Sequence, residues 1–127
     1  MRALVVDDSR SMRTIISKQL KELGFEVFEA ANGHEAMAKL HDTKKITLIL
    51  LDWNMPEMDG LEVLNLIRAE PDYKEIRVMM VTTESEMAHV AIALEAGASE
   101  YLMKPFDREA LLEKLILLGM DPSTRTL

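Results

Sequence analysis

Short apolar runs alternate with amphipathic stretches along the chain. Segment 4–6 is an unbroken apolar run, and segment 46–51 is apolar except for Thr47. Such runs are typical of strands buried on both faces of a parallel sheet. After the first run, Ile16 and Leu20 lie four residues apart within a helical pattern. Gly24 follows and predicts the end of that helix.

The same two patterns alternate to the end of the chain. Strands are expected at 4–6, 25–29, 46–51, 78–81 and 101–103. The helices after the first are expected to carry Ala36, Met37 and Leu40; Leu61, Leu64 and Ile67; and Met87, Ala91 and Leu94. The last helix is expected to carry Leu111, Leu112, Leu115 and Leu118 on its inner face. Asn32 with Glu35 resembles a capping box, and Asp107 is predicted to cap the last helix. Five strands alternating with five helices predict a doubly wound α/β fold.

Length and composition narrow the class of protein. A chain of 127 residues is one ordinary globular domain, and residues 121–127 are expected to be a short polar tail. The formal charge of −7 argues against binding to nucleic acid or to anionic membranes, since both need clustered cations. The absence of cysteine excludes disulfides and thiolate metal sites. No export signal or membrane-spanning run is visible, so a cytoplasmic location is expected.

Polar side chains stand just beyond the predicted strands. They are Asp7 and Asp8 after the first strand, Asp52 after the third, Thr82 and Thr83 after the fourth, and Lys104 after the fifth. Right-handed crossovers place the carboxyl ends of parallel strands at one edge of the sheet, where ligands of such folds bind. We therefore expect an acidic cluster, a hydroxyl group and a lysine to share one site.

Three carboxylates at one edge repel one another. At about 5 Å and an effective dielectric constant of about 20, each pair costs about 3 kcal/mol. A hard divalent cation with oxygen ligands relieves this repulsion, and Mg²⁺ takes one or two carboxylates together with waters and phosphate oxygens. Such a site suits phosphoryl transfer to an aspartate. Lys104 can then stabilise the added charge, and Thr82 can donate a hydrogen bond to a phosphoryl oxygen.

Several motifs resemble the receiver domain of two-component response regulators, of the single-domain, CheY-like chemotaxis type. They are V-V-D-D-S from Val5, L-L-D-W-N-M-P-E-M-D-G from Leu50, V-T-T-E from Val81 and A-G-A-S-E-Y-L-M-K-P-F from Ala96. The resemblance covers nearly the whole chain and implies a receiver domain over 1–120. It also implies a five-stranded parallel sheet in the order 2-1-3-4-5, a flavodoxin-like three-layer sandwich.

The resemblance assigns roles to individual residues. Asp52 would be the phosphoacceptor, and Thr82 and Lys104 would hold the phosphoryl group. Asp8 and Asp52 would be magnesium ligands, with Asp7 holding a coordinated water and Asn54 supplying its backbone carbonyl. Tyr101 would rotate inward on activation, and Asn54 and Glu84 would tune the lifetime of the phosphoryl group, which is expected to be short. Lys104–Pro105 would be a cis peptide bond. Thr83 departs from the family, which often has a smaller residue there, and its bulk is expected to slow the entry of phosphodonors.

The function expected from these residues is a phosphorylation-activated response regulator. A histidine kinase would donate the phosphoryl group. The protein is expected to be a monomer and a signalling switch rather than an enzyme. Once phosphorylated, it would bind a target through the face formed by the fourth helix, fifth strand and fifth helix. Chemotaxis is the first expectation, with a flagellar motor switch or a phosphatase as target. A phosphorelay, another pathway or a receiver excised from a longer regulator remains an alternative.

Three other classes fit the sequence less well. A haloacid-dehalogenase-type phosphatase also uses an aspartyl nucleophile, but its D-x-D motif is absent, because Asn54 stands two residues after Asp52. A flavodoxin would bring its cofactor phosphate against Asp7 and Asp8, which would repel it. A degenerate receiver that only scaffolds would lack site residues, and every expected one is present.

Overall fold

The computed structural model describes residues 1–120, and the predicted polar tail at 121–127 lies outside the described residues. Within the described part, the strands are β1 (Arg2–Val6), β2 (Glu26–Ala30), β3 (Ile46–Asp52), β4 (Arg77–Thr82) and β5 (Glu100–Met103). The α-helices are α1 (Arg10–Glu22), α2 (Gly33–Asp42), α3 (Gly60–Ala69), α4 (Val90–Glu95) and α5 (Arg108–Leu117). Two short 3₁₀-helices, η1 (Pro71–Tyr73) and η2 (Glu84–His89), precede β4 and α4.

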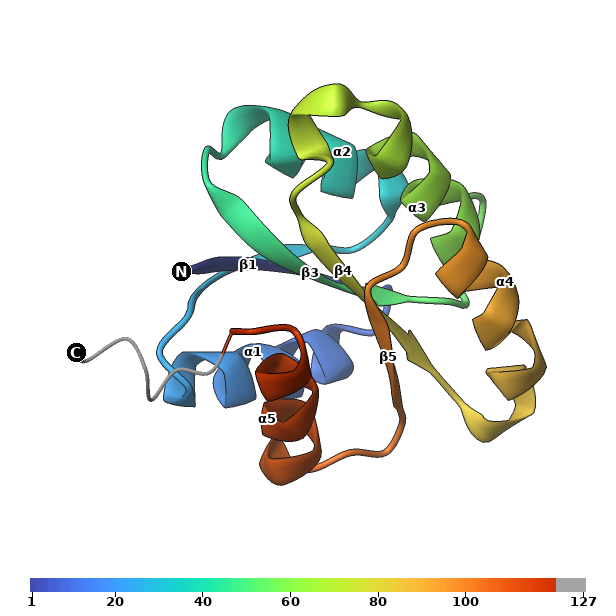
Figure 1. Cartoon of the computed structure of the whole chain (residues 1–127). Helices are drawn as coiled ribbons and strands as arrows, with labels where there is room; N and C mark the ends of the chain where they lie inside the picture. The colour runs from blue at the N-terminus through green and yellow to red at the C-terminus, as the bar shows by residue number, and fades with distance from the viewer. Residues whose placement is uncertain (121–127) are drawn as a thin grey trace.

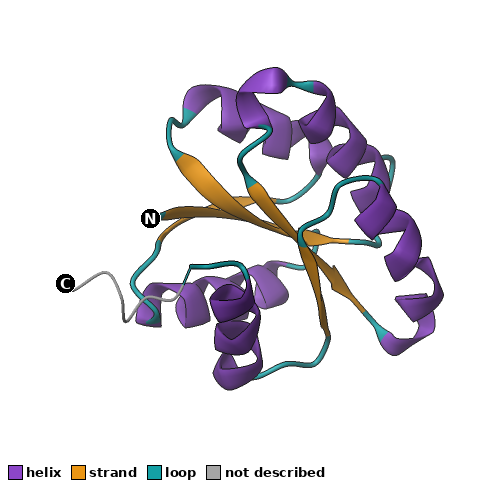
Figure 2. Cartoon of the chain, in the orientation of Figure 1, coloured by secondary structure: helices purple, strands orange, loops and turns teal. Residues whose placement is uncertain are grey.

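All neighbouring strands pair in parallel, in the order β2-β1-β3-β4-β5, which confirms the predicted topology. Helices α1 and α5 cover one face of the sheet, and α2, α3 and α4 cover the other (Figures 1 and 2). No helix within residues 1–120 is long and apolar enough to cross a bilayer.

The central strand β3 supplies side chains to the cores on both faces of the sheet. Ile49 and Leu51 pack in the core beneath α2 and α3, whereas Leu48 and Leu50 pack in the core beneath α1 and α5. All four side chains are buried, as the apolar residues at 48–51 predict for a strand covered on both sides. Burial of the strands on both faces fixes the sheet, and with it the edge at which the strands end.

Side-chain caps begin four of the helices. The predicted caps are confirmed: Asn32 Oδ1 accepts from the Glu35 amide at 2.8 Å, and Asp107 Oδ1 accepts from the Ala110 amide at 2.8 Å. Ser9 and Asp59 cap α1 and α3 in the same way. Each cap satisfies an amide that has no partner inside its helix, so the chain turns sharply from the strand ends into the helices.

The fourth helix differs from the α-helix expected to carry Met87, Ala91 and Leu94. Met87 lies in η2, and the buried residues of α4 are Val90 and Ala93, while Leu94 is 43% exposed. The cause is η2, because a 3₁₀-helix has about 3.0 residues per turn and an α-helix about 3.6. Each 3₁₀ residue therefore advances the helix face by about 20° more than an α-helical residue, and η2 has six residues.

Candidate metal and phosphoacceptor site

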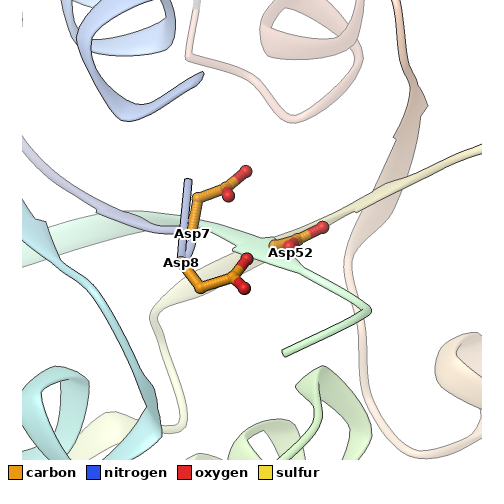
Figure 3. A group of neighbouring side chains, drawn as sticks. All are labelled: Asp7, Asp8 and Asp52. Carbon is orange, nitrogen blue, oxygen red and sulfur yellow. The ribbon is translucent and has the colours of Figure 1, made fainter. Parts of the chain in front are cut away.

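Three carboxylates meet at the carboxyl edge of the sheet. Strands β1 and β3 pair with Val6 beside Leu51, so Asp7 and Asp52, one residue further on, are neighbours. Carboxylate oxygens of Asp7, Asp8 and Asp52 all lie within 4.8 Å of one another, and the Asp8 side chain points toward Asp52 (Figure 3). The predicted acidic cluster is thus present.

The predicted lysine joins this cluster from the end of β5. Lys104 Nζ donates to Asp7 Oδ2 at 2.9 Å and to Asp52 Oδ1 at 3.2 Å. Burial lowers the pKa of Lys104, but the hydrogen bonds and negative charges of Asp7 and Asp52 outweigh burial and leave its pKa raised. Lys104 is therefore an ammonium ion that bridges two buried carboxylates. The Lys104–Pro105 bond is cis, as the resemblance implied.

Asp52 carries a charge that its surroundings do not fully balance. The residue is only 6% exposed, and burial raises the pKa of its carboxyl group from 3.8 to about 6. Lys104 lowers this pKa, whereas the charges of Asp7 and Asp8 raise it further. One ammonium thus stands against three carboxylates, and burial disfavours the ionised form of Asp52.

Asp7 and Asp8 differ in their surroundings. Asp7 is buried, and its two carboxylate oxygens accept from the Ser9 amide and from Lys104. Its backbone carbonyl accepts from Arg13 Nη1 at 2.7 Å. Asp8 is exposed to solvent. Asp7 is therefore a fixed part of the site, while Asp8 is the carboxylate open to an incoming ion.

Thr82 and Tyr101, the predicted switch residues, lie on adjacent strands. Thr82 is buried, and its hydroxyl donates to the Thr83 carbonyl at 3.1 Å rather than to a carboxylate of the cluster. Tyr101 is partly buried, and Lys114 Nζ lies 4.2 Å from the centre of its ring. Lys114 also forms an ion pair with Glu100 at 3.1 Å, so a cation from α5 covers the tyrosine ring.

The two predicted lifetime-tuning residues follow the ends of β3 and β4. Asn54 lies in the loop after β3, and Glu84 is the first residue of η2. Both side chains are exposed. They are therefore open to solvent, from which a water or a phosphodonor would approach.

Sequence reasoning missed three residues that shape the site. Gly60 donates its amide to the Trp53 carbonyl at 2.8 Å, and a Cβ atom there would lie 2.5 Å from the Asp52 carbonyl oxygen. His89 stacks on Trp53 with ring centres 5.5 Å apart. Arg13 reaches the cluster from α1, as described above. The D-G pair that opens α3 signalled a turn, but no pattern in the sequence pointed to the His89 and Arg13 contacts.

The residues of the cluster fit a hard divalent cation. The donors are carboxylate oxygens, as Mg²⁺ prefers. Burial is the main cause of the raised pKa of Asp52, and the three carboxylates face one ammonium, that of Lys104, which leaves negative charge to be balanced. A divalent cation would supply this missing charge, and the exposed Asp8 leaves it a path from solvent.

A parallel sheet in this strand order, with an acidic cluster and a lysine at its carboxyl edge, defines a receiver. Residues 3–116 match the response regulator receiver domain family, and the chain belongs to this family.

Among its relatives are chemotaxis proteins of the CheY type. The chain is 47% identical to chemotaxis protein CheY1 of Helicobacter pylori over 121 residues, which cover 94% of this chain and 98% of the relative. It is 47% identical to a chemotaxis protein CheY homolog of Campylobacter jejuni, over 91% of this chain and 89% of the relative. The structure of the chemotaxis response regulator CheY4 of Vibrio cholerae is similar, with a TM-score of 0.84 and 38% identity over 92% of this chain and 97% of that one. A CheY-type receiver is a phosphorylation-activated signalling switch, the class predicted from the sequence.

Proposed function

We propose that Asp52 accepts a phosphoryl group in a magnesium-dependent reaction and that the phosphorylated chain then binds a target protein. The observation that carries this proposal is the position of Asp52, buried between Lys104 and the carboxylates of Asp7 and Asp8, with its pKa raised to about 6. An ionised carboxylate in need of a counter-charge is a nucleophile at a site suited to a cation and a phosphate.

The metal would be held by Asp8, Asp52 and the backbone carbonyl of Asn54, with Asp7 holding a coordinated water. When bound, Mg²⁺ neutralises carboxylate and phosphate oxygens during phosphoryl transfer. The chain's own groups then do the rest. Lys104, already a cation beside Asp52, turns toward the phosphoryl oxygens, and the Thr82 hydroxyl donates a hydrogen bond to one of them.

The reaction is a transfer between two side chains. An oxygen of the Asp52 carboxylate forms the new bond to phosphorus, and the bond between phosphorus and the donor's imidazole nitrogen breaks. The nitrogen keeps the bonding electron pair, and the histidine of the kinase, which carries a proton on its other ring nitrogen, leaves as a neutral imidazole. Water later attacks the acyl phosphate, and Asn54 and Glu84, whose side chains are exposed, set how long it survives.

The hydrogen bonds proposed for the phosphorylated state are strong enough to drive the conformational switch. Moving a population from 1:99 to 99:1 takes about 5.5 kcal/mol, and hydrogen bonds to charged groups contribute about 1.5–3 kcal/mol each. New bonds from Thr82, Lys104 and a backbone amide can supply this difference. Once Thr82 turns toward the phosphate, Tyr101 fills the space behind it, and the face formed by α4, β5 and α5 changes.

That face is the proposed binding surface for the target. Exposed apolar side chains occur on each of its three elements: Ile92 on α4, Met103 on β5, and Ile116 and Leu117 on α5. The similarity to chemotaxis proteins supports chemotaxis as the pathway, the cytoplasm as the location, a histidine kinase as the donor, and a flagellar motor switch or a phosphatase as the target. The receiver domain is proposed to span 1–120 and to act as a monomer.

The test compares the wild type with Asp52→Asn. Trp53 fluorescence is followed on addition of Mg²⁺ and then of acetyl phosphate, and intact mass is measured after rapid quenching. The wild type should respond to the metal, respond further to the donor and gain the mass of one phosphoryl group. Asp52→Asn should gain none. A wild type with no magnesium response, or a phosphoryl adduct that persists in Asp52→Asn, would refute the proposal.

A further inference from the structure

The hydroxyl of Thr82 has a specific acceptor in the unphosphorylated protein. Thr82 is 1% exposed, and its Oγ1 donates to the Thr83 carbonyl at 3.1 Å. A buried hydroxyl group without a partner is costly. The hydroxyl therefore needs one acceptor in each state, which would be the Thr83 carbonyl before phosphorylation and a phosphoryl oxygen afterwards.

The Thr83 carbonyl is held in place by a capping box at the start of η2. It accepts from the Glu86 amide at 3.0 Å, while Glu86 Oε1 accepts from the Thr83 amide and from the Thr83 hydroxyl, both at 3.0 Å. The Thr83 hydroxyl also lies 3.0 Å from Ser85 Oγ. The carboxylate of Glu86 thus holds both the backbone amide and the side-chain hydroxyl of Thr83, the residue whose carbonyl accepts from Thr82.

The helix that the box begins depends on such support. η2 runs for six residues in 3₁₀ geometry, whereas 3₁₀ runs longer than about three or four residues are uncommon because their hydrogen bonds are poorer. Glu86 is partly exposed, and one of its carboxylate oxygens accepts both the amide and the hydroxyl of Thr83. The box is therefore a specific contact at the point where β4 leaves the sheet.

We propose that Glu86 is a positioning residue that, through the Thr83 capping box, holds the Thr82 hydroxyl on the Thr83 carbonyl and so favours the unphosphorylated arrangement of the site. The consequence is that the box opposes capture of a phosphoryl group, and this part of the inference rests on the proposed function. Opening the box leaves the Thr83 carbonyl free to move and weakens the competing acceptor.

The first test needs no phosphoryl chemistry. Three-bond NMR couplings to the Thr82 methyl group report its χ1 rotamer in the unphosphorylated protein. We expect one rotamer in the wild type and in Glu86→Gln, whose amide oxygen still accepts, and averaging over rotamers in Glu86→Ala. Thr83→Ala, which loses the hydroxyl bond but keeps the backbone bond, should lie between them. A single unchanged Thr82 rotamer in Glu86→Ala and Thr83→Ala would overturn the proposal.

The second test measures capture of a phosphoryl mimic, beryllofluoride with Mg²⁺, by the midpoint of the Trp53 fluorescence change. Loss of one neutral hydrogen bond corresponds to about a fivefold change in an equilibrium constant, so Glu86→Ala should bind at about a fivefold lower concentration. Glu86→Gln removes the same charge and should bind as the wild type does. Equal shifts in Glu86→Ala and Glu86→Gln would mean that charge alone acts, and would overturn the proposal.

The chain offers a matched control in α2. There Asn32 accepts from the Glu35 amide, and the Glu35 carboxylate accepts from the Ala31 amide at 3.1 Å. Glu35→Ala breaks an equivalent cap and should leave the Thr82 rotamer and the beryllofluoride midpoint unchanged. A shift equal to that of Glu86→Ala would mean that any loss of stability has this effect, and would overturn the proposal. A wild type that ignores beryllofluoride would refute the proposed function, while the rotamer measurement would still decide this inference.

Discussion

Replacing Asp52 by asparagine should stabilise the metal-free protein. The pKa of this carboxyl group rises from 3.8 to about 6 in the fold, so the folded state binds the proton more tightly than the unfolded state. Ionisation of Asp52 therefore takes nothing from the free energy of unfolding below the unfolded pKa of this group, and it lowers that free energy by its full amount above about pH 6. Two pKa units correspond to about 3 kcal/mol. Asparagine is an isostere of the neutral acid and never incurs this cost.

Urea unfolding in a chelator, followed by far-ultraviolet circular dichroism, measures the effect. At pH 8, Asp52→Asn should raise the free energy of unfolding by up to about 3 kcal/mol, and at pH 5 about half of that gain should remain. Asp42→Asn makes the same chemical change on an exposed side chain and should alter stability by no more than about 0.5 kcal/mol. If Asp52→Asn is no more stable than the wild type at pH 8, the ionised carboxylate is not the strained group inferred here.

Magnesium should reverse the order of stability. A ligand that binds only the folded state at about one hundred times its dissociation constant adds about 2.7 kcal/mol, and Asp52 is one of the proposed ligands. The wild type should therefore gain more from the metal than Asp52→Asn does, and the difference seen in the chelator should shrink. Equal gains for the two proteins would place the ion elsewhere.

Three further substitutions test single contacts. Lys104→Met leaves two buried carboxylates without their cation, and should cost about 3 kcal/mol of unfolding free energy in a chelator but less with Mg²⁺; urea unfolding in both conditions checks this. Gly60→Ala places a Cβ atom 2.5 Å from the Asp52 carbonyl oxygen, and overpacking of this kind should lower stability by about 1–3 kcal/mol, seen as a lower thermal midpoint. Lys114→Met removes the cation over the Tyr101 ring, so NMR should show faster flipping of that ring, and an unchanged rate would mean that Lys114 does not hold it.

The fold followed from the sequence because its signals are strong and independent. The segment 46–51, apolar except for Thr47, suits a strand covered on both faces, and the burial of its five apolar residues in β3 confirms that reading. The acidic cluster also followed, since the ends of parallel strands meet at one edge whatever the detailed packing. Asp7, Asp52 and Lys104 needed only their positions just beyond or at the ends of strands to be placed together.

The contacts that depend on helix geometry did not follow. The periodicity around Met87 was read as α-helical, but the segment winds as a 3₁₀-helix and turns a different face inward. Sequence spacing alone does not distinguish 3.0 from 3.6 residues per turn over six residues. The stacking of His89 on Trp53 depends on that winding, so it was hidden for the same reason. Arg13 was hidden because its contact joins a helix to a backbone carbonyl, which has no signature in the side-chain pattern.

The two contacts of Lys104 explain how one cation can serve both states of the site. Its ammonium lies 2.9 Å from Asp7 and 3.2 Å from Asp52. Asp7 is fixed on its other oxygen by the Ser9 amide and is not the proposed acceptor of phosphate. Lys104 can therefore keep its Asp7 contact while its other hydrogen bond passes from the Asp52 carboxylate to a phosphoryl oxygen attached to it. Because the Asp7 contact stays in place, the exchange needs only a small rotation of the Lys104 side chain, which is already ordered. The entropy cost of ordering a lysine has then been met before the phosphoryl group arrives.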